Sequence, residues 1–297
     1  MGQEYTAETS LQIQRLIEDS IKKFVDESPG NRLADFGGDP IFEEPLVGFA
    51  DGNDPLFSQY KSIIGEFHMT PREMLQTHAE GLSVEQLANI GVISWILPIA
   101  EATRRSNREM DEGPTIRWYQ TRWHGEAFND ALKKHVIELL QRLGYIAIAP
   151  GLTPSFKTLQ LDNGPASTWS ERHVAYAAGL GTFSLSDGLI TPKGIAMRCG
   201  SVVTNLAFVA SPRNYANHVA NCPFIQDGSC GVCIERCPAG AIGASGHDKK
   251  RCKQFLEVDL RAWASTREGW DLSIGPYVAC GLCQTRVPCE SQIPPRQ

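Results

Sequence analysis

The chain has 297 residues, of which 42% are hydrophobic and 21% are charged, and its formal net charge is −6 at pH 7. This length suits one large domain or two, and the apolar share is enough for a sizeable buried core. The acidic balance and the lack of a basic run exclude the electrostatic surface that duplex nucleic acid requires. No stretch of about 18 apolar residues is present, so no membrane span is predicted. The first ten residues show no export signal, so a cytoplasmic location is expected.

The N-terminal region is predicted to hold one long helix followed by irregular chain. Apolar side chains recur at helical spacing over residues 11–25, which predicts a helix with one buried stripe. Residues 30–54 are rich in Gly, Pro and Asp and are predicted to be irregular. Thr70 and Ser83 each begin a capping box, so two short helices are expected to start there.

The middle of the chain alternates between predicted strands and helices. The apolar run Gly91–Leu97 predicts a buried strand, and the polar segment Arg104–Pro114 is predicted to be a loop. An apolar stripe predicts a long helix that runs to Leu143, with Gly144 at the position after its end. Tyr145–Ala149 is predicted to be the next strand.

A third group of elements precedes the cysteine-rich tail. Residues 171–178 are predicted to be helical and are followed by Gly179-x-Gly181. A hairpin-like passage is expected at 188–194, and a β-branched run predicts a strand within 199–208. A dinucleotide-binding loop is excluded, because the third glycine position holds Ser184 and no βαβ unit surrounds it.

Eight of the nine cysteines lie in the last quarter of the chain. Residues 230–238 follow the pattern Cys-x2-Cys-x3-Cys-Pro, which reproduces the last three ligands and the proline of the bacterial ferredoxin run. Eight thiolates at four per cluster predict two [4Fe–4S] clusters, and the cysteine before the proline ligates the other cluster in such runs. The predicted ligands are Cys222, Cys230, Cys233 and Cys289 for one cluster, and Cys237, Cys252, Cys280 and Cys283 for the other.

Other interpretations of the cysteines were weighed. Regular spacing would place the first ligand at Asp227, five residues after Cys222, but soft thiolate suits iron–sulfur clusters better than carboxylate. Zinc would use four sulfurs and leave the rest without a role, and disulfides would need an oxidising compartment. Cys199 lies outside both motifs and is expected to be dispensable for the clusters.

Besides the two cluster motifs, four segments stand out, namely Ser170-Glu171-Arg172, Ala178-Gly179-Leu180-Gly181, Leu189-Ile190-Thr191 and Gly200-Ser201-Val202-Val203-Thr204. Together these motifs resemble the superfamily of epoxyqueuosine reductases and reductive dehalogenases, over about Val92–Cys289. The resemblance implies an α/β (α+β) fold. Residues 1–80 would be a helical and irregular region packed on the core, 81–215 a nitroreductase-like corrinoid-binding domain, and 216–297 a ferredoxin-like double-cluster domain.

The resemblance also implies a cobalamin that receives electrons from the two clusters. Base-off binding is implied, because the Asp-x-His-x-x-Gly motif that supplies a histidine ligand is absent. The residues expected to bind the corrinoid are Gly179, Leu180, Gly181, Thr191, Gly200, Ser201 and Thr204.

The catalytic residues are inferred from the same resemblance. Epoxyqueuosine reductases carry an acid in an Arg-Asp-Tyr-His string, whereas residues 121–124 here read Thr-Arg-Trp-His, so the acid is lost and Trp123 lies in this string. Dehalogenases use a tyrosine with a basic neighbour in this region. The predicted catalytic residues are Tyr119 and His124 as proton donors and Arg122 as the group that holds negative charge. They are expected to face residues 179–204 across the substrate cavity.

The expected function is a cobalamin-dependent reductase of a small-molecule substrate, supplied by a low-potential donor such as ferredoxin or flavodoxin. The chain ends eight residues after Cys289, so the C-terminal extension that grips tRNA in epoxyqueuosine reductases, and tRNA binding itself, are not expected. One alternative is an electron-transfer or corrinoid-activating protein without substrate chemistry of its own. Another is a cluster-bearing binding or sensor protein that has lost the corrinoid. The lost acid, in the string that contains Trp123, favours these alternatives.

Overall fold

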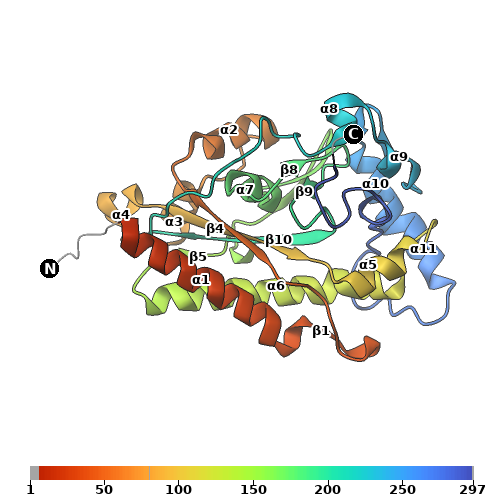
Figure 1. Cartoon of the computed structure of the whole chain (residues 1–297), viewed down its shortest axis with the longest axis horizontal. Helices are drawn as coiled ribbons and strands as arrows, with labels where there is room; N and C mark the ends of the chain where they lie inside the picture. Colours follow the sequence, from red (N-terminus) through yellow and green to blue (C-terminus); the bar gives the residue numbers. More distant parts are fainter. Residues whose placement is uncertain (1–6, 80, 296–297) are drawn as a thin grey trace.

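A computed structural model describes residues 7–79 and 81–295, and its centre is a four-stranded sheet (Figure 1). The strand order is β3-β4-β10-β5, and each neighbouring pair is antiparallel. All eight residues of β4 are buried, as expected for a central strand covered on both faces. The strands are β3 (Leu46–Asp51), β4 (Gly91–Pro98), β5 (Ala147–Ile148) and β10 (Met197–Thr204).

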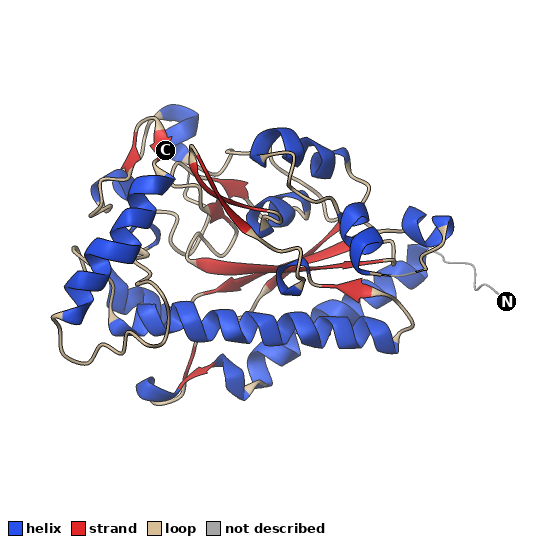
Figure 2. Ribbon diagram, turned by 180° about the vertical axis from the view of Figure 1, so that it is seen from behind, coloured by secondary structure: helices blue, strands red, loops and turns tan. Residues whose placement is uncertain are grey.

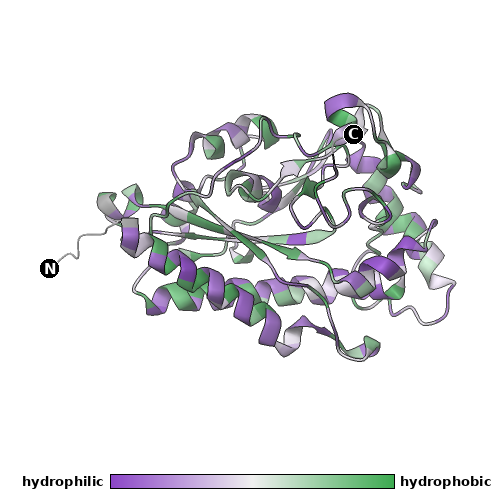
Figure 3. Cartoon of the chain, viewed as in Figure 1, coloured by the Kyte–Doolittle hydropathy of each residue, from purple (hydrophilic) through white to green (hydrophobic). Residues whose placement is uncertain are grey.

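Helices cover both faces of this sheet (Figures 1 and 2). α1 (Ala7–Glu27) and the long α6 (Ile116–Arg142) lie side by side on one face, in a core that includes Trp95 and Phe128. Figure 3 shows the central strands as mainly hydrophobic, while α1 carries both kinds of residue. The helices on the other face are α2 (Pro55–Ile64), α3 (Pro71–His78) and α7 (Glu171–Ala177).

The remaining elements are short. The cysteine-rich tail forms small helices and turns at one end of the sheet, beside α5 (Figure 1). Its elements are α8 (Pro223–Asp227), α9 (Val232–Glu235), β11 (Ile242–Gly243), β12 (Gly246–His247), α10 (Lys249–Gln254), a π-helical turn (Phe255–Asp259) and α11 (Leu260–Ser265). Elsewhere lie β1 (Arg32–Leu33), β2 (Asp39–Pro40), α4 (Val84–Ala88), α5 (Glu101–Arg108), β6 (Thr158–Leu161), β7 (Gly164–Ser167), β8 (Thr182–Phe183) and β9 (Leu189–Ile190), with 3-10 turns at Pro29–Asn31, Ala34–Phe36, Pro150–Leu152 and Leu282–Gln284.

Most predicted elements are confirmed. The capping boxes at Thr70 and Ser83 are formed, with reciprocal side-chain and backbone hydrogen bonds, at the starts of α3 and α4. The stripe over 11–25 lies within α1, and α6 ends one residue before Leu143. Gly144 has φ 87°, a conformation that favours glycine after a helix end.

Two predicted assignments are wrong. Leu46–Asp51 lies in the segment predicted to be irregular, yet it forms the edge strand β3, because it pairs with β4 in the register Val47 to Trp95. Part of the predicted loop from residue 104 forms α5, which tertiary ion pairs hold in place. Arg104 contacts Glu43 (3.3 Å), and Arg108 contacts Glu290 (2.6 Å).

The predicted division into domains stays a prediction, although its first two regions share one sheet through β3 and β4. Residues 1–6, 80 and 296–297 of the predicted regions lie outside the described residues. Among the helices that are described, none is both long enough and apolar enough to cross a bilayer.

Candidate functional site

The first predicted group of cysteines comes together around two short helices near the C-terminus. Cys222 precedes α8 and Cys233 lies in α9, while Cys289 approaches from a loop. Burial, followed by the neighbouring thiols of Cys233, Cys222 and Cys230, raises the pKa of Cys289 to about 12. The four thiols therefore lie close enough to influence one another, beside a small cavity of about 20 Å³.

The second predicted group of cysteines lies next to the first. Burial raises the pKa of Cys280 to about 12, and the nearby thiols of Cys252 and Cys237 act in the same direction. Cys283 is half-buried, and desolvation raises its pKa well above the ordinary value, with further effects from the thiols of Cys280, Cys252 and Cys237, followed by Cys233 of the first group. The two groups of four thiols thus adjoin near Cys283.

Helix α5 fixes two of the loops that carry cysteines, a role that sequence reasoning missed because this segment was predicted to be a loop. Glu290, next to Cys289, accepts hydrogen bonds from Arg108 Nε (2.9 Å) and Nη2 (2.6 Å). Asn107 Nδ2 donates to the carbonyl oxygen of Cys280 (3.3 Å). Both loops are therefore anchored to one rigid helix.

Other candidate ligands lie apart from these groups. Asp227 is exposed, and its carboxylate accepts a hydrogen bond from the backbone of Ser229 (2.8 Å). Cys199 lies on β10 and contacts Met197 Sδ (3.4 Å). Throughout residues 7–79 and 81–295, no three His, Cys, Asp or Glu side chains converge in a way that would hold one metal ion. A four-iron cluster attaches each thiolate to a different iron, so its ligands are spaced more widely than those of a single ion.

A large cavity of about 1200 Å³ lies between the sheet domain and the cysteine-rich tail. Its walls come from α2, β6–β7, α7, the β8–β9 turn, residues 218–225 and the end of the β11–β12 hairpin. Most of its lining is apolar or aromatic, as is typical of cofactor sites. Ser184 and Phe224 line both this cavity and the small cavity beside the first cysteine group, so the two cavities adjoin at these side chains.

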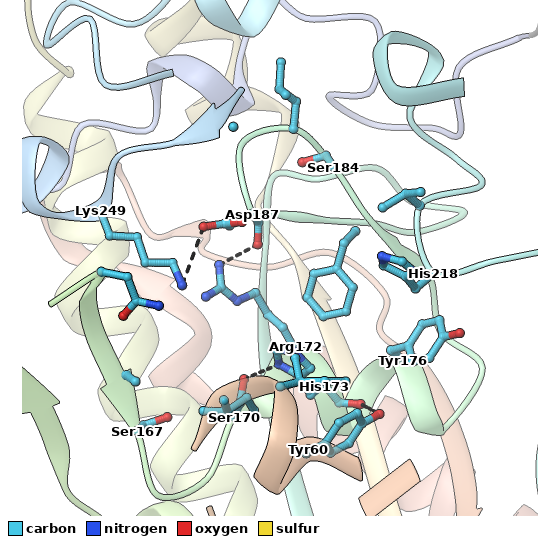
Figure 4. Close-up of a pocket in the computed structure, with 18 of the residues that line it drawn as sticks. Tyr60, Ser167, Ser170, Arg172, His173, Tyr176, Ser184, Asp187, His218 and Lys249 are labelled. Atoms are coloured by element: carbon cyan, nitrogen blue, oxygen red, sulfur yellow. Dashed lines mark hydrogen bonds and ion pairs between the residues drawn. The ribbon is translucent and has the colours of Figure 1, made fainter. Parts of the chain in front are cut away.

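Charged and polar side chains gather on one wall of the large cavity (Figure 4). Arg172 donates to the carbonyl oxygen of Asp187 (2.7 Å), and Lys249 Nζ lies 3.8 Å from the carboxylate of Asp187. Burial alone would raise the pKa of Asp187, but the hydrogen bond with His247 and the charge of Lys249 lower it overall. Asp187 therefore stays ionised and joins α7 to the cysteine-rich tail.

His173 is a half-buried histidine of this wall. Burial, with a smaller effect from Arg172, lowers its pKa to about 3, so its ring is neutral near pH 7. Ser170 Oγ lies 2.8 Å from its Nδ1, and Tyr60 donates to its carbonyl oxygen (2.7 Å). These contacts fix the ring at the cavity wall.

The predicted catalytic residues lie elsewhere. Tyr119 is fully buried beside Trp270, and His124 is exposed. Arg122 donates to Glu126 (3.0 Å) and to Tyr277 Oη (2.9 Å). None of these three predicted residues lines the large cavity, which lies beside α7 and the β8–β9 turn instead of beside residues 119–124.

The residues predicted to bind the corrinoid also do not line this cavity. Their close packing explains the glycines. A Cβ on Gly179 would lie 2.6 Å from Pro212 O, one on Gly181 2.5 Å from Ile190 O, and one on Gly200 2.5 Å from the Trp95 ring. Leu180 is buried, and the fully buried hydroxyl residues of this set are Thr191, Ser201 and Thr204. The structure brings their flanking residues to the cavity, from Ser170 to Tyr176 on one side and from Phe183 to Asp187 on the other.

No protein-family model matches the chain. Among curated proteins, epoxyqueuosine reductase of Bacillus anthracis is 32% identical over 124 residues, which are 40% of this chain and 29% of that protein. The same enzyme of Bacillus cereus is 31% identical over 124 residues, with the same coverage. The matched segment thus spans under a third of the length of these relatives.

Solved structures of related enzymes also match. Epoxyqueuosine reductase from Bacillus subtilis aligns with 96% of this chain and 70% of its own, at 17% identity and a TM-score of 0.47. A catabolic reductive dehalogenase aligns with 96% of this chain and 37% of its own, at 14% identity and a TM-score of 0.46. The resemblance to epoxyqueuosine reductases that the motifs indicated is thus confirmed by the curated sequences.

Proposed function

We propose that this chain is a cobalamin-dependent reductase that carries two [4Fe–4S] clusters and reduces a small-molecule substrate. The observation that carries this proposal is the large cavity that shares Ser184 and Phe224 with the wall of the first cysteine group. A cavity of this kind next to electron-transfer centres suits a redox cofactor. Similarity to epoxyqueuosine reductases supports the same chemistry.

The cysteines fit the proposed clusters. One cluster would be held by Cys222, Cys230, Cys233 and Cys289, and the other by Cys237, Cys252, Cys280 and Cys283. Burial and mutual repulsion disfavour the free thiolates of Cys289 and Cys280. Bound iron would relieve this cost, because each thiolate would face a cation. The tail would then be the ferredoxin-like domain, and the sheet the nitroreductase-like domain.

The large cavity fits a corrinoid better than a small ligand. Drug-sized pockets are typically about 300–1,000 Å³, and this cavity holds about 1200 Å³. Tyr60, Tyr176 and Phe183 would cover an apolar face, while Arg172 and Lys249 would reach polar groups at the edge. When bound, cobalamin would supply a metal centre of low potential for substrate reduction. The base-off state stays part of this proposal.

The lining of the large cavity offers a different polar group from those predicted by the sequence. Tyr119, Arg122 and His124 stay predicted catalytic residues, but they do not line the large cavity. His173 does, and its ring is held by Ser170. A neutral imidazole can donate a hydrogen bond from its N–H to an oxygen that gains negative charge. His173 is therefore the cavity group that we assign to donating a hydrogen bond to the substrate, and not to transferring a proton.

The test is to prepare the chain anaerobically, to measure iron and sulfide, and then to titrate cobalamin by difference spectroscopy. About eight irons and eight sulfides per chain are expected, together with one bound cobalamin and turnover with a ferredoxin or flavodoxin as donor. About four irons would contradict the cluster assignment, and no bound cobalamin would contradict the enzyme.

One observation favours the electron-transfer alternative. Trp123, in the segment that carries the family acid, packs against Gly275 and donates from Nε1 to the Tyr277 carbonyl oxygen (3.2 Å). This position is therefore structural, with no titratable group. Clusters that reduce cleanly in a protein that binds no corrinoid would support this alternative.

A further inference from the structure

A cluster of charged side chains lies between α6 and β10, separate from the wall of the large cavity. Asn129 of α6 clamps the two elements together, because its Nδ2 donates to the carbonyl oxygen of Cys199 (2.9 Å). Residues three, four and seven positions away from Asn129 share its face of the helix. The charged residues on that face are Arg122, Glu126 and Lys133.

Arg198 precedes Cys199 on β10 and points into the same cluster. Its Nε is buried and has no hydrogen-bond partner, and among the described residues its guanidinium makes no ion pair. Burial, and then the like charge of Arg122, lower the pKa of Arg198 to about 10. A desolvated guanidinium beside a second one is costly unless an anion offsets both charges.

The protein itself supplies too little negative charge here. Arg122 Nη1 lies 3.0 Å from Glu126, and Lys133 Nζ lies 3.8 Å from the same carboxylate. Arg198 and Arg122 are the strongest charges that lower the pKa of Glu126, against the opposite effect of its burial. One carboxylate is therefore shared by three cations, whose side chains are only 17% exposed at Arg122 and 5% at Lys133.

The other two acids nearby do not correct this excess. Asp130 pairs with Lys133 (2.9 Å), but its side chain is 40% exposed, so water screens its charge. Glu171 is held by Ser201 (2.5 Å), and burial raises its pKa to about 7, so it is only partly ionised near neutral pH. Arg198 and Arg122 thus remain without a full counter-charge.

We infer that Arg198 and Arg122 form a binding site for the carboxylate or phosphate group of a ligand. A guanidinium fork matches the two oxygens of such groups, and this match makes arginine the preferred residue for binding them. Tyr277, which accepts a hydrogen bond from Arg122 Nη2 (2.9 Å), would orient that side chain. The inference rests on the proposed function only for the source of the anion, which is either an acidic substrate or the phosphodiester of the corrinoid tail.

The site is tested on the cluster-bearing protein with inorganic phosphate and acetate as probes, by calorimetric titration. Arg198→Gln and Arg122→Gln should each weaken binding of the better probe by roughly ten- to hundredfold, because each removes charge-assisted hydrogen bonds. Lys134→Gln is the matched control. Lys134 is an exposed cation of α6 next to Lys133, so this variant should bind as wild type does.

A stability measurement guards against variants that simply misfold. Arg198→Met keeps an unbranched apolar stem and removes the charge, so it should melt at the same temperature as wild type or higher without anion. Added phosphate or acetate should raise the melting temperature of wild type and not that of Arg198→Met. Wild type that binds neither probe, or an Arg198→Gln variant that binds as tightly as wild type, would overturn the inference.

Two corrinoids distinguish the sources of the anion. Cobalamin carries the phosphodiester tail, whereas cobinamide lacks it. If Arg198→Gln binds cobalamin more weakly than wild type does but binds cobinamide equally well, the site is assigned to the cofactor tail. If Arg198→Gln binds both corrinoids as tightly as wild type does but no longer binds phosphate or acetate, the site is assigned to the substrate. If no corrinoid binds but the probes still require Arg198, the proposed function fails and the anion site stands.

Discussion

The cysteine-rich tail and the large cavity differ in how the chain builds them. Seven of the eight tail cysteines fall within residues 230–289, and the groups they form follow from spacing along the chain. The cavity wall instead joins segments as distant as Tyr60, Asp187 and Lys249. Chemistry that depends on local spacing is thus readable from the sequence, whereas a cavity made from distant segments depends on the tertiary fold.

The largest effect is expected from a single change in the tail. Cys252→Ser should lower the iron content from about eight to about four per chain, because one cluster loses a thiolate ligand. Cys199→Ser is the matched control, since Cys199 lies on β10 and is expected to leave the iron unchanged. Iron analysis of both variants checks this. Equal iron in the two variants would mean that the spacing in the tail does not define the clusters.

A second change tests whether packing supports the tail as much as spacing does. Gly281 has φ 66°, and a Cβ there would overlap the ring of Trp118. Gly281→Ala should therefore displace the loop with Cys280 and Cys283 and deplete the same cluster, with a melting temperature several degrees lower. Gly243→Ala is the control, because a Cβ at Gly243 has no atom within 4 Å. Full iron in Gly281→Ala would show that this loop tolerates the shift.

A smaller effect concerns the pH dependence of the sheet region. Burial lowers the pKa of His68 to about 4, so the folded protein resists its protonation while the unfolded chain accepts a proton near pH 6.5. The free energy of unfolding should therefore keep its full value above about pH 6.5. It should fall by up to about 3 kcal/mol as the pH drops toward 4. His173 should add to this fall, because its pKa is also lowered by burial.

The test is urea unfolding of wild type and His68→Gln across this pH range. Glutamine can still accept the hydrogen bond that His68 Nε2 receives from the backbone of Ser170 (3.1 Å). The variant should lose less stability than wild type between pH 6.5 and 4. Parallel pH curves for the two proteins would show that His68 is not the group that titrates.

The fold and the site were predictable to the extent that their signals are local. Capping boxes at Thr70 and Ser83 and the apolar run of β4 each mark their elements within a few residues. β3 was missed, because its pairing with β4 and not its own pattern makes it a strand. The Ser170-Glu171-Arg172 motif was noticed, but nothing local indicated that Arg172 meets Asp187 at a cavity wall.

The central claim is that the cavity beside the cysteine-rich tail holds a corrinoid. Ala166→Trp on β7 would fill that cavity from its wall, while Gln160→Trp places the same bulk on an exposed position of the paired strand β6. Cobalamin binding by difference spectroscopy, with iron content measured in parallel, compares the two. The account predicts one cobalamin per chain for wild type and Gln160→Trp, and binding at least about tenfold weaker for Ala166→Trp with full iron. Equal binding by all three proteins, or none by wild type, would contradict it.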